Sequence, residues 1–268
     1  MKKNPIGIFD SGIGGLSVVK KVRNILKYED IIYFGDTARV PYGTKSKKLI
    51  EKFALDDVNF LLKFNPKVII IACHTASSLA GQLLKRKFPS LNIIDVISSS
   101  IKKTIKITGK KRVGVIGTSA TISSGKYEEL LKKYNKKISV FSMSCPLFVP
   151  LVEEGLFAAP CTYFIAEYYL KRLKKKNIDT LILGCTHYPY LKKVIQQTIG
   201  KNVKIVDPSD EVALNLKKYL ENNNLLKNEK KTGKMKLFFS DISPYTEKVI
   251  KKIFPESGEY TLHNVSNV

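Results

Sequence analysis

Cysteine is scarce in this chain, whose 268 residues contain only Cys73, Cys145, Cys161 and Cys185. Small domains that depend on disulfides carry a far higher density, so the sequence excludes a disulfide-held scaffold. We expect the four thiols to stay reduced in the cytosol. Each is therefore left as a core residue, a metal ligand or a reactive group.

Long hydrophobic runs are absent as well. No apolar stretch approaches the roughly 18 residues that a membrane-spanning helix needs. The first residues, MKKNPIGIFDSG, reach Asp10 before an apolar segment of signal-peptide length forms. We therefore expect a cytoplasmic protein that has no membrane as a partner.

Arginine is rare for so basic a protein. Among 46 basic residues only five are arginine, although the formal net charge is +23. Recognition of bases and phosphates favours the guanidinium group, and the lysines are spread along the whole chain. We interpret them as solvated helix faces and do not expect nucleic acid as a partner, although a basic nucleic-acid-binding protein stays as an alternative. The positive field would still steer an anionic substrate inward.

Two stretches of the sequence follow the same plan, 112 residues apart: Val68–Ser78, VIIIACHTASS, and Thr180–Tyr190, TLILGCTHYPY. In both, an apolar run typical of a parallel strand buried on both faces ends at a small residue and a cysteine. Ligands of open α/β sheets bind at the carboxyl ends of the strands. The pattern predicts that Cys73 and Cys185 occupy matching positions in two similar halves and face each other.

Further segments support an internal repeat. Ile6–Asp10 corresponds to Val113–Gly117, and Ile31–Phe34 to Ile138–Phe141, each pair 107 residues apart. Matching segments in the same order are typical of a duplicated unit. We therefore predict an α/β protein with two quasi-symmetric parallel-sheet domains. The first comprises residues 1–97 and 209–268, because the short C-terminal part has to pack back on it, and the second comprises residues 98–208.

Polar segments follow the predicted strands. The turn DSGIGG brings Asp10 and Ser11 to a helix start, whose free N–H groups favour an anion. We interpret this turn as a cradle for a small carboxylate or phosphate. The donor-rich loop GDTARVPYGTKS is a second candidate part of the site, and Glu153 stands in an otherwise apolar stretch.

Three interpretations of the cysteines stay open on the residues alone. Cys73 and Cys185 can be small buried hydrophobic residues, the commonest fate of a free cysteine. Together with His74 and His187 they can bind zinc, although the spacings differ from the usual ones. As a pair of thiols they can invert a stereocentre, one removing a proton and the other delivering a proton on the opposite face.

Five motifs, DSGIGG, GDTARVPYG, ACHTAS, GTSATI and LGCTHYP, resemble in sequence and order those of glutamate racemases. The resemblance implies two flavodoxin-like, doubly wound domains with the active site between them. It implies an isomerase that interconverts L- and D-glutamate without pyridoxal phosphate, another cofactor or a metal, and that supplies D-glutamate for peptidoglycan. Glutamate is then the small-molecule partner, and a homodimer is left open.

The same resemblance assigns roles to residues. Cys73 and Cys185 form the catalytic acid/base pair, Cys73 taking the proton from D-glutamate and Cys185 from L-glutamate. Asp10, Glu153 and His187 tune the pair. The residues expected to hold the amino and carboxylate groups of the substrate are Asp10, Ser11, Tyr42, Gly43, His74, Thr75, Thr121, Thr186 and His187.

Position 74 departs from the family pattern, which usually has Asn there, whereas this chain has His. With an ordinary pKa near 6.5, His74 can gain a proton just below neutrality. We hypothesise that His74 makes substrate binding sensitive to pH. Two other activities stay open, namely a racemase for aspartate or another amino acid, and a thiol enzyme that uses one cysteine with His187 as its base.

Overall fold

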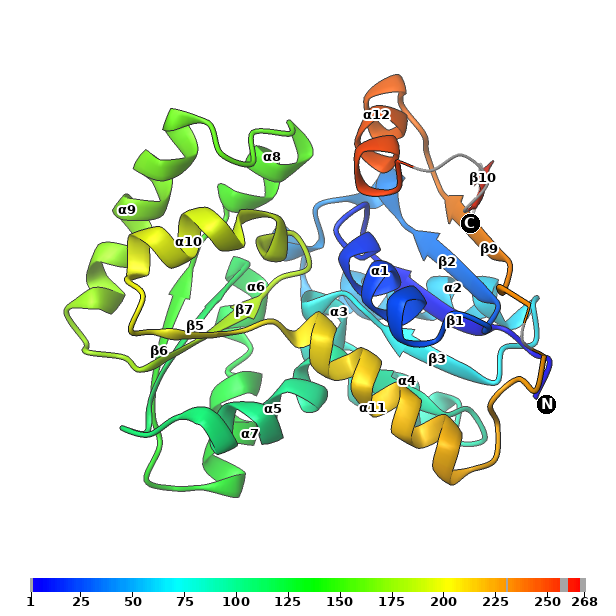
Figure 1. Cartoon of the computed structure of the whole chain (residues 1–268), viewed down its shortest axis with the longest axis horizontal. Helices are drawn as coiled ribbons and strands as arrows, with labels where there is room; N and C mark the ends of the chain where they lie inside the picture. Colours follow the sequence, from blue (N-terminus) through cyan, green and yellow to red (C-terminus); the bar gives the residue numbers. More distant parts are fainter. Residues whose placement is uncertain (1, 230, 256–259, 266–268) are drawn as a thin grey trace.

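The computed structural model describes residues 2–229, 231–255 and 260–265. Its strands form two separate parallel sheets, which lie in the two halves of the molecule (Figure 1). The first sheet has the order β10-β9-β2-β1-β3-β4, and the second has the order β6-β5-β7-β8. The strands are β1 (Ile6–Asp10), β2 (Ile31–Gly35), β3 (Val68–Ile71), β4 (Ile93–Asp95), β5 (Arg112–Gly117), β6 (Ser139–Ser144), β7 (Thr180–Gly184), β8 (Lys204–Val206), β9 (Met235–Phe239) and β10 (Thr261–Asn264).

The predicted repeat is confirmed by the strand order, because β2-β1-β3-β4 and β6-β5-β7-β8 are the same arrangement. The register agrees for the strands that precede the cysteines, because Ile6 of β1 pairs with Val68 and Val113 of β5 pairs with Thr180. The match of Ile31 with Ile138 was wrong by two residues, because Ile6 pairs with Ile31 whereas Val113 pairs with Val140. A sheet with this order and helices on both faces is the doubly wound α/β fold that the sequence predicted.

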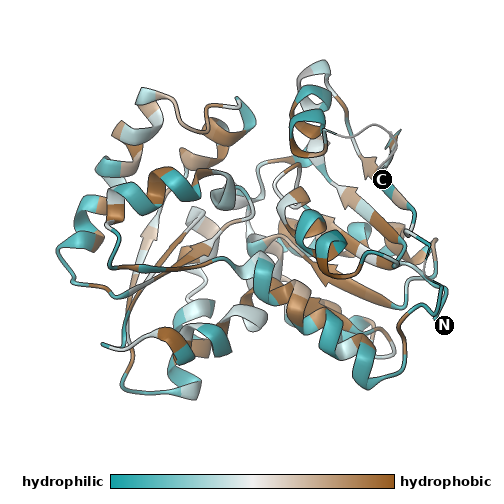
Figure 2. Ribbon diagram, viewed as in Figure 1, coloured by the Kyte–Doolittle hydropathy of each residue, from teal (hydrophilic) through white to brown (hydrophobic). Residues whose placement is uncertain are grey.

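Helices cover both sheets, so the strands are apolar and the outer faces of the helices are polar (Figure 2). Every residue of β1, β2, β3 and β7 is buried, as expected for central parallel strands. The α-helices are α1 (Leu16–Ile25), α2 (Lys47–Leu62), α3 (His74–Leu79), α4 (Gly81–Lys87), α5 (Val96–Ile107), α6 (Ser119–Ser123), α7 (Lys126–Tyr134), α8 (Phe148–Glu153), α9 (Pro160–Lys174), α10 (Lys192–Ile199), α11 (Pro208–Asn222) and α12 (Pro244–Ile253). Short 3₁₀ turns lie at η1 (Thr37–Arg39), η2 (Tyr42–Thr44) and η3 (Tyr188–Leu191). None of the described helices is long and apolar enough to cross a bilayer.

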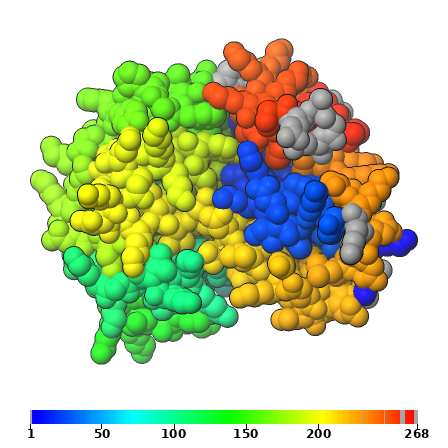
Figure 3. All heavy atoms as spheres, viewed as in Figure 1, coloured from blue at the N-terminus to red at the C-terminus, as the bar shows by residue number. Residues whose placement is uncertain are grey.

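The chain passes between the halves at two equivalent points. After β4, Asp95 caps α5 by accepting from Ser98 N at 2.8 Å, and after β8, Asp207 caps α11 by accepting from Ser209 N at 3.0 Å. Helix α5 packs on the second half and on α11, while α11 packs on α1 of the first half. In the space-filling view, yellow atoms of the second half and of α11 meet the blue atoms of α1 (Figure 3).

The C-terminal segment returns to the first half, as the sequence predicted. Strand β9 pairs with β2, with Met235 opposite Ile31, and β10 continues the sheet beside β9. We therefore retain as a proposal the division into residues 1–97 plus 209–268 and residues 98–208, whose boundaries fall in the two crossings.

Candidate active site

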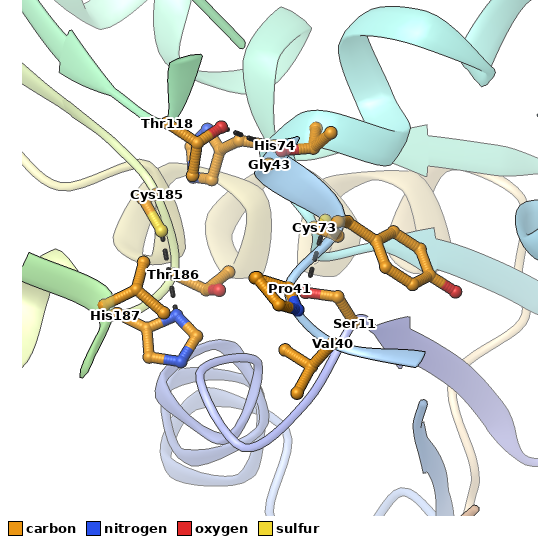
Figure 4. Close-up of a pocket in the computed structure, with 13 residues that line it drawn as sticks. Ser11, Val40, Pro41, Gly43, Cys73, His74, Thr118, Cys185, Thr186 and His187 are labelled. Atoms are coloured by element: carbon orange, nitrogen blue, oxygen red, sulfur yellow. Dashed lines mark hydrogen bonds between the residues drawn. The ribbon is translucent and has the colours of Figure 1, made fainter. Parts of the chain in front are cut away.

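Both cysteines of the repeated motif line one small cavity between the halves (Figure 4). The sulfurs of Cys73 and Cys185 lie on opposite sides of it, and the ring of His187 lies below Cys185 in this view. The cavity measures about 20 Å³, which is room for one water molecule. Its walls are formed by Ser11, Val40, Pro41, Tyr42, Gly43, Cys73, His74, Thr75, Thr118, Val149, Cys185, Thr186 and His187.

Cys73 is placed by the start of α3. It is the N-cap residue of that helix, and its sulfur accepts from Ala76 N at 3.4 Å. The thiol donates to the Ser11 hydroxyl at 3.7 Å. Burial raises the pKa of Cys73, and the nearby carboxylate of Asp10 raises it further. Cys73 is therefore held as the neutral thiol, the form that can give up a proton.

Cys185 has a different electrostatic environment. Its sulfur lies 3.7 Å from Nδ1 of His187, whose Nε2 lies 3.2 Å from a carboxylate oxygen of Glu153. Burial by itself lowers the pKa of His187, but the hydrogen bonds to Cys185 and Glu153 outweigh it and raise the pKa to about 10. His187 is therefore an imidazolium at neutral pH. A cation at this distance stabilises negative charge on the Cys185 sulfur, the form that can accept a proton.

Asp10 occupies the turn that we interpreted as a cradle for a ligand anion. One of its carboxylate oxygens accepts from Gly12 N at 3.2 Å and from Gly15 N at 2.9 Å, and the other accepts from the Thr186 hydroxyl at 3.1 Å. The expectation of a ligand cradle was therefore wrong at these donors, because the anion that they hold is the chain's own Asp10. Burial raises the pKa of Asp10, while the charge of His187 opposes that shift.

Three threonine hydroxyls join the halves at the cavity, two of them on its wall and the third, that of Thr121, directly behind it. Thr75 follows the first cysteine, whereas Thr118 and Thr121 follow β5. The hydroxyl oxygens lie 3.0 Å apart for Thr75 and Thr118, 3.2 Å for Thr75 and Thr121, and 2.9 Å for Thr118 and Thr121. In the closed cavity these groups satisfy one another, and together they form a set of donors that a carboxylate can recruit.

Tyr42 lines the cavity, but its hydroxyl is used elsewhere. It forms hydrogen bonds within a buried network with the carboxyl groups of Asp36 and Asp57, and Arg39 binds the same two groups. This network fixes the loop between β2 and α2, so Tyr42 offers the side of its ring to the cavity, beside Val40 and Pro41 of the same loop. Gly43 allows close approach, since a Cβ there would lie 2.6 Å from Thr118 Cβ.

His74 does not behave as the sequence suggested. Its ring is buried and its Nδ1 shares a hydrogen bond of 2.9 Å with the hydroxyl of Tyr127. Burial lowers the pKa of His74 to about 3, so the ring is neutral throughout the neutral range. The hypothesis that His74 gains a proton just below neutrality was therefore wrong, because the sequence could not show how completely α7 covers the ring.

The structure brings most of the predicted site residues to the cavity wall. Three predicted residues lie one contact behind the wall. Asp10 contacts Thr186, Thr121 contacts Thr75, and Glu153 contacts His187. Sequence reasoning missed Val40, Pro41, Thr118 and Val149, of which Thr118 had a signal as the N-cap residue in GTSATI. In the described part of the chain, no three His, Cys, Asp or Glu side chains group as a metal site would. Cys145 and Cys161 lie outside the cavity wall.

Comparison with known proteins agrees with this geometry. The family model described as Asp/Glu/hydantoin racemase matches residues 6–215. The glutamate racemase of Chlorobium phaeobacteroides is 44% identical over 95% of this chain and 93% of its own. Among solved structures, the glutamate racemase of Francisella tularensis in complex with D-glutamate is 40% identical, with a TM-score of 0.92, over 99% of this chain and 98% of its own. The glutamate racemase of Bacillus anthracis is 33% identical, with a TM-score of 0.95, over the same shares of the two chains. The chain therefore belongs to the Asp/Glu/hydantoin racemase family, in the group of the glutamate racemases.

Proposed function

We propose that this protein is an isomerase that interconverts L- and D-glutamate by proton transfer between the substrate and two cysteines. The observation that carries the proposal is the placement of Cys73 and Cys185 on opposite sides of one cavity. Inversion at Cα requires that a proton leave one face and another arrive on the opposite face. Two thiols supplied by the two halves of a repeat meet that requirement without a cofactor.

The unequal environments of the thiols set the direction in which each works first. For L-glutamate, the Cys185 sulfur, which lies beside the His187 imidazolium, acts as the base and takes the proton from Cα. The Cys73 thiol gives its proton to the other face of the resulting carbanion. D-glutamate leaves behind a Cys185 thiol and a Cys73 thiolate. Before the next L-glutamate reacts, Cys185 releases its proton to solvent and Cys73 takes one up from solvent, whereas a D-glutamate that binds first is converted by the same steps in reverse. Asp10 and Glu153 act on this cycle through the charges that they place near Cys73 and His187.

Substrate binding requires the cavity to enlarge. The volume of about 20 Å³ is far too small for glutamate, so we propose that the halves separate to admit it and close over it. On closure the hydroxyls of Thr75, Thr118 and Thr121 exchange their mutual hydrogen bonds for bonds to a substrate carboxylate. Ser11 and Thr186 provide further hydroxyls on the same wall.

Incubation of the protein with L-glutamate in deuterated water tests the function directly. We expect D-glutamate carrying deuterium at Cα, until the two enantiomers are present in equal amounts, since they have equal free energies. Chiral chromatography with mass spectrometry gives both readings. Preference for L-aspartate would favour the aspartate alternative, and exchange of deuterium without inversion would favour a one-cysteine enzyme.

The proposed chemistry needs no bound metal or carbonyl cofactor. Activity should therefore survive a chelator and a carbonyl reagent, each measured against an untreated sample. Loss of activity on chelation that zinc restores would contradict the two-thiol mechanism.

We also propose the cellular role of the protein: a cytoplasmic enzyme that supplies D-glutamate for peptidoglycan, with a homodimer as its candidate assembly.

His74→Asn tests the corrected role of position 74. Because burial keeps the pKa of His74 near 3, the ring does not titrate where the enzyme works. We expect the pH dependence of KM and of kcat to have the same shape in the variant and the parent between about pH 6 and 8. Steady-state kinetics across that range decides. An inflection present only in the parent would show that His74 gains a proton after all.

A further inference from the structure

Tyr127 connects the two cysteine segments from a position behind the cavity. It lies on α7, is 3% exposed, and does not line the cavity itself. Its hydroxyl is 2.9 Å from Nδ1 of His74, the residue after Cys73. The other side of the ring packs on the residue before Cys185, since a Cβ added to Gly184 would lie 3.3 Å from Tyr127 Cε2. One side chain of the second half thus touches the neighbours of both reacting thiols.

The bond between Tyr127 and His74 has to be assigned a direction. A neutral imidazole carries one proton, so if one ring nitrogen accepts a hydrogen bond the other is a donor. Burial lowers the pKa of His74 and raises that of Tyr127, so both groups are neutral. Tyr127 also hydrogen-bonds with Ser100, whose hydroxyl donates to the Ile97 carbonyl at 2.8 Å. The Tyr127 proton therefore has two possible acceptors, the Ser100 oxygen and Nδ1 of His74, and the imidazole nitrogen is the stronger acceptor of the two.

The position of His74 in the cavity wall bears on which ring nitrogen carries the proton. His74 forms part of the cavity wall, and Nδ1 is the ring nitrogen that Tyr127 engages. A bare nitrogen lone pair at Nε2 would repel a substrate carboxylate, whereas an N–H there would donate to it. Because the phenol is a good donor and the imidazole nitrogen a good acceptor, the favourable arrangement has Tyr127 donating to Nδ1.

We infer that Tyr127 is a positioning residue that fixes His74 in the tautomer with its proton on Nε2, so that the ring offers a neutral donor to a carboxylate of the substrate. The inference rests on the proposed racemase function. It also explains how a histidine serves at a position where an amide would otherwise donate. The amide of Asn carries its own N–H₂ donor and needs no partner to select it, so an enzyme with Asn at position 74 should be indifferent to Tyr127.

A double-mutant cycle tests this dependence. In the parent, Tyr127→Phe should raise KM for glutamate by about 2- to 10-fold, the range expected for loss of one hydrogen bond, with kcat nearly unchanged. In the His74→Asn background the same substitution should leave KM within about twofold, because the interaction that it removes is already gone. Tyr134→Phe is the matched control on the same helix, since Tyr134 is 58% exposed.

An equal rise in KM in both backgrounds would show that Tyr127 acts on the fold alone and would overturn the inference.

The tautomer can also be measured independently of activity, by ¹⁵N NMR of the parent labelled at its histidines. The chain contains only three, and His74→Asn identifies the signal. We expect an unprotonated Nδ1 and a protonated Nε2. A proton on Nδ1 would refute the assigned tautomer even if racemisation is confirmed. Failure of the parent to racemise glutamate would refute the proposed function, and the NMR result on the tautomer would still hold.

Discussion

Serine in place of either Cys73 or Cys185 should stop racemisation. Each thiol is buried in the cavity wall. In the proposed mechanism each has to act as an acid in one direction and as a base in the other. A serine hydroxyl is a far weaker acid than a thiol, so it cannot release its proton or accept one at the required point. General acid–base groups contribute about 10²- to 10⁴-fold to a rate, and we expect a loss of that size in kcat from either substitution.

Exchange in deuterated water separates the two positions. With Cys185 intact, Cys73→Ser should retain exchange at Cα of L-glutamate, and Cys185→Ser should retain exchange at Cα of D-glutamate. Cys161→Ser is the control, because Cys161 is exposed and lies outside the cavity wall. Full turnover by both single variants would exclude the two-thiol scheme. The opposite pattern of exchange would keep the scheme and reverse the assignment of the enantiomers.

A single methyl group at Gly14 should be almost as damaging. A Cβ built there would lie 2.5 Å from His187 Nδ1 and 2.6 Å from Thr186 Oγ1, distances at which buried side chains have to shift. The shift would separate His187 from Cys185, which are 3.7 Å apart, and remove the cation that favours charge on the sulfur. Displacement of a catalytic group by about 1 Å can reduce activity by about 100-fold, and we expect Gly14→Ala to lose at least that much in kcat/KM.

Gly12→Ala provides the matched control in the same turn. Its added Cβ would lie 3.5 Å from Val40 Cγ2 and 4.0 Å from a Glu153 carboxylate oxygen, which are ordinary contacts. The control should therefore keep most of its activity. Kinetics should be measured below the unfolding midpoint of both variants, so that a loss of stability is not mistaken for a loss of catalysis. Equal activity of the two variants would mean that His187 does not depend on this turn.

The sequence predicted the fold because its strands are buried on both faces. Such strands are continuous apolar runs, so Val68–Ile71 and Thr180–Gly184 were visible without any knowledge of their partners. The cysteines follow directly, and the order of the carboxyl-end segments is enough to place them near one cavity. The prediction that Cys73 and Cys185 share a site required only this short-range information.

Features that depend on partners distant in the chain could not be predicted in this way. The turn donors were expected to bind a ligand, but Gly12 N and Gly15 N bind the carboxylate of Asp10 within the same turn. The part of this contact that depends on a distant partner is the hydrogen bond from Thr186 to Asp10. His74 was expected to titrate, but Tyr127 lies 53 positions further along and its packing on the ring is a tertiary event. The hydroxyl of Tyr42 is turned away by Asp57, which lies on α2 and carried no signal of its own.

The pairing of β2 with β9 has a consequence for how the chain is made. Strand β2 is entirely apolar and buried, yet its neighbour on one side begins at Met235, so that edge stays open until nearly the whole chain has been synthesised. At about 5–20 residues per second, the wait is roughly 10–40 s, long enough for every strand of the second half to emerge first. Ser240 then accepts from Ala38 N at 2.9 Å and donates to Asp36 at 2.9 Å, which anchors the loop that carries Pro41 and Gly43 to the cavity. The second half can thus fold while the first half is still incomplete, and the cavity between the halves forms only as translation ends.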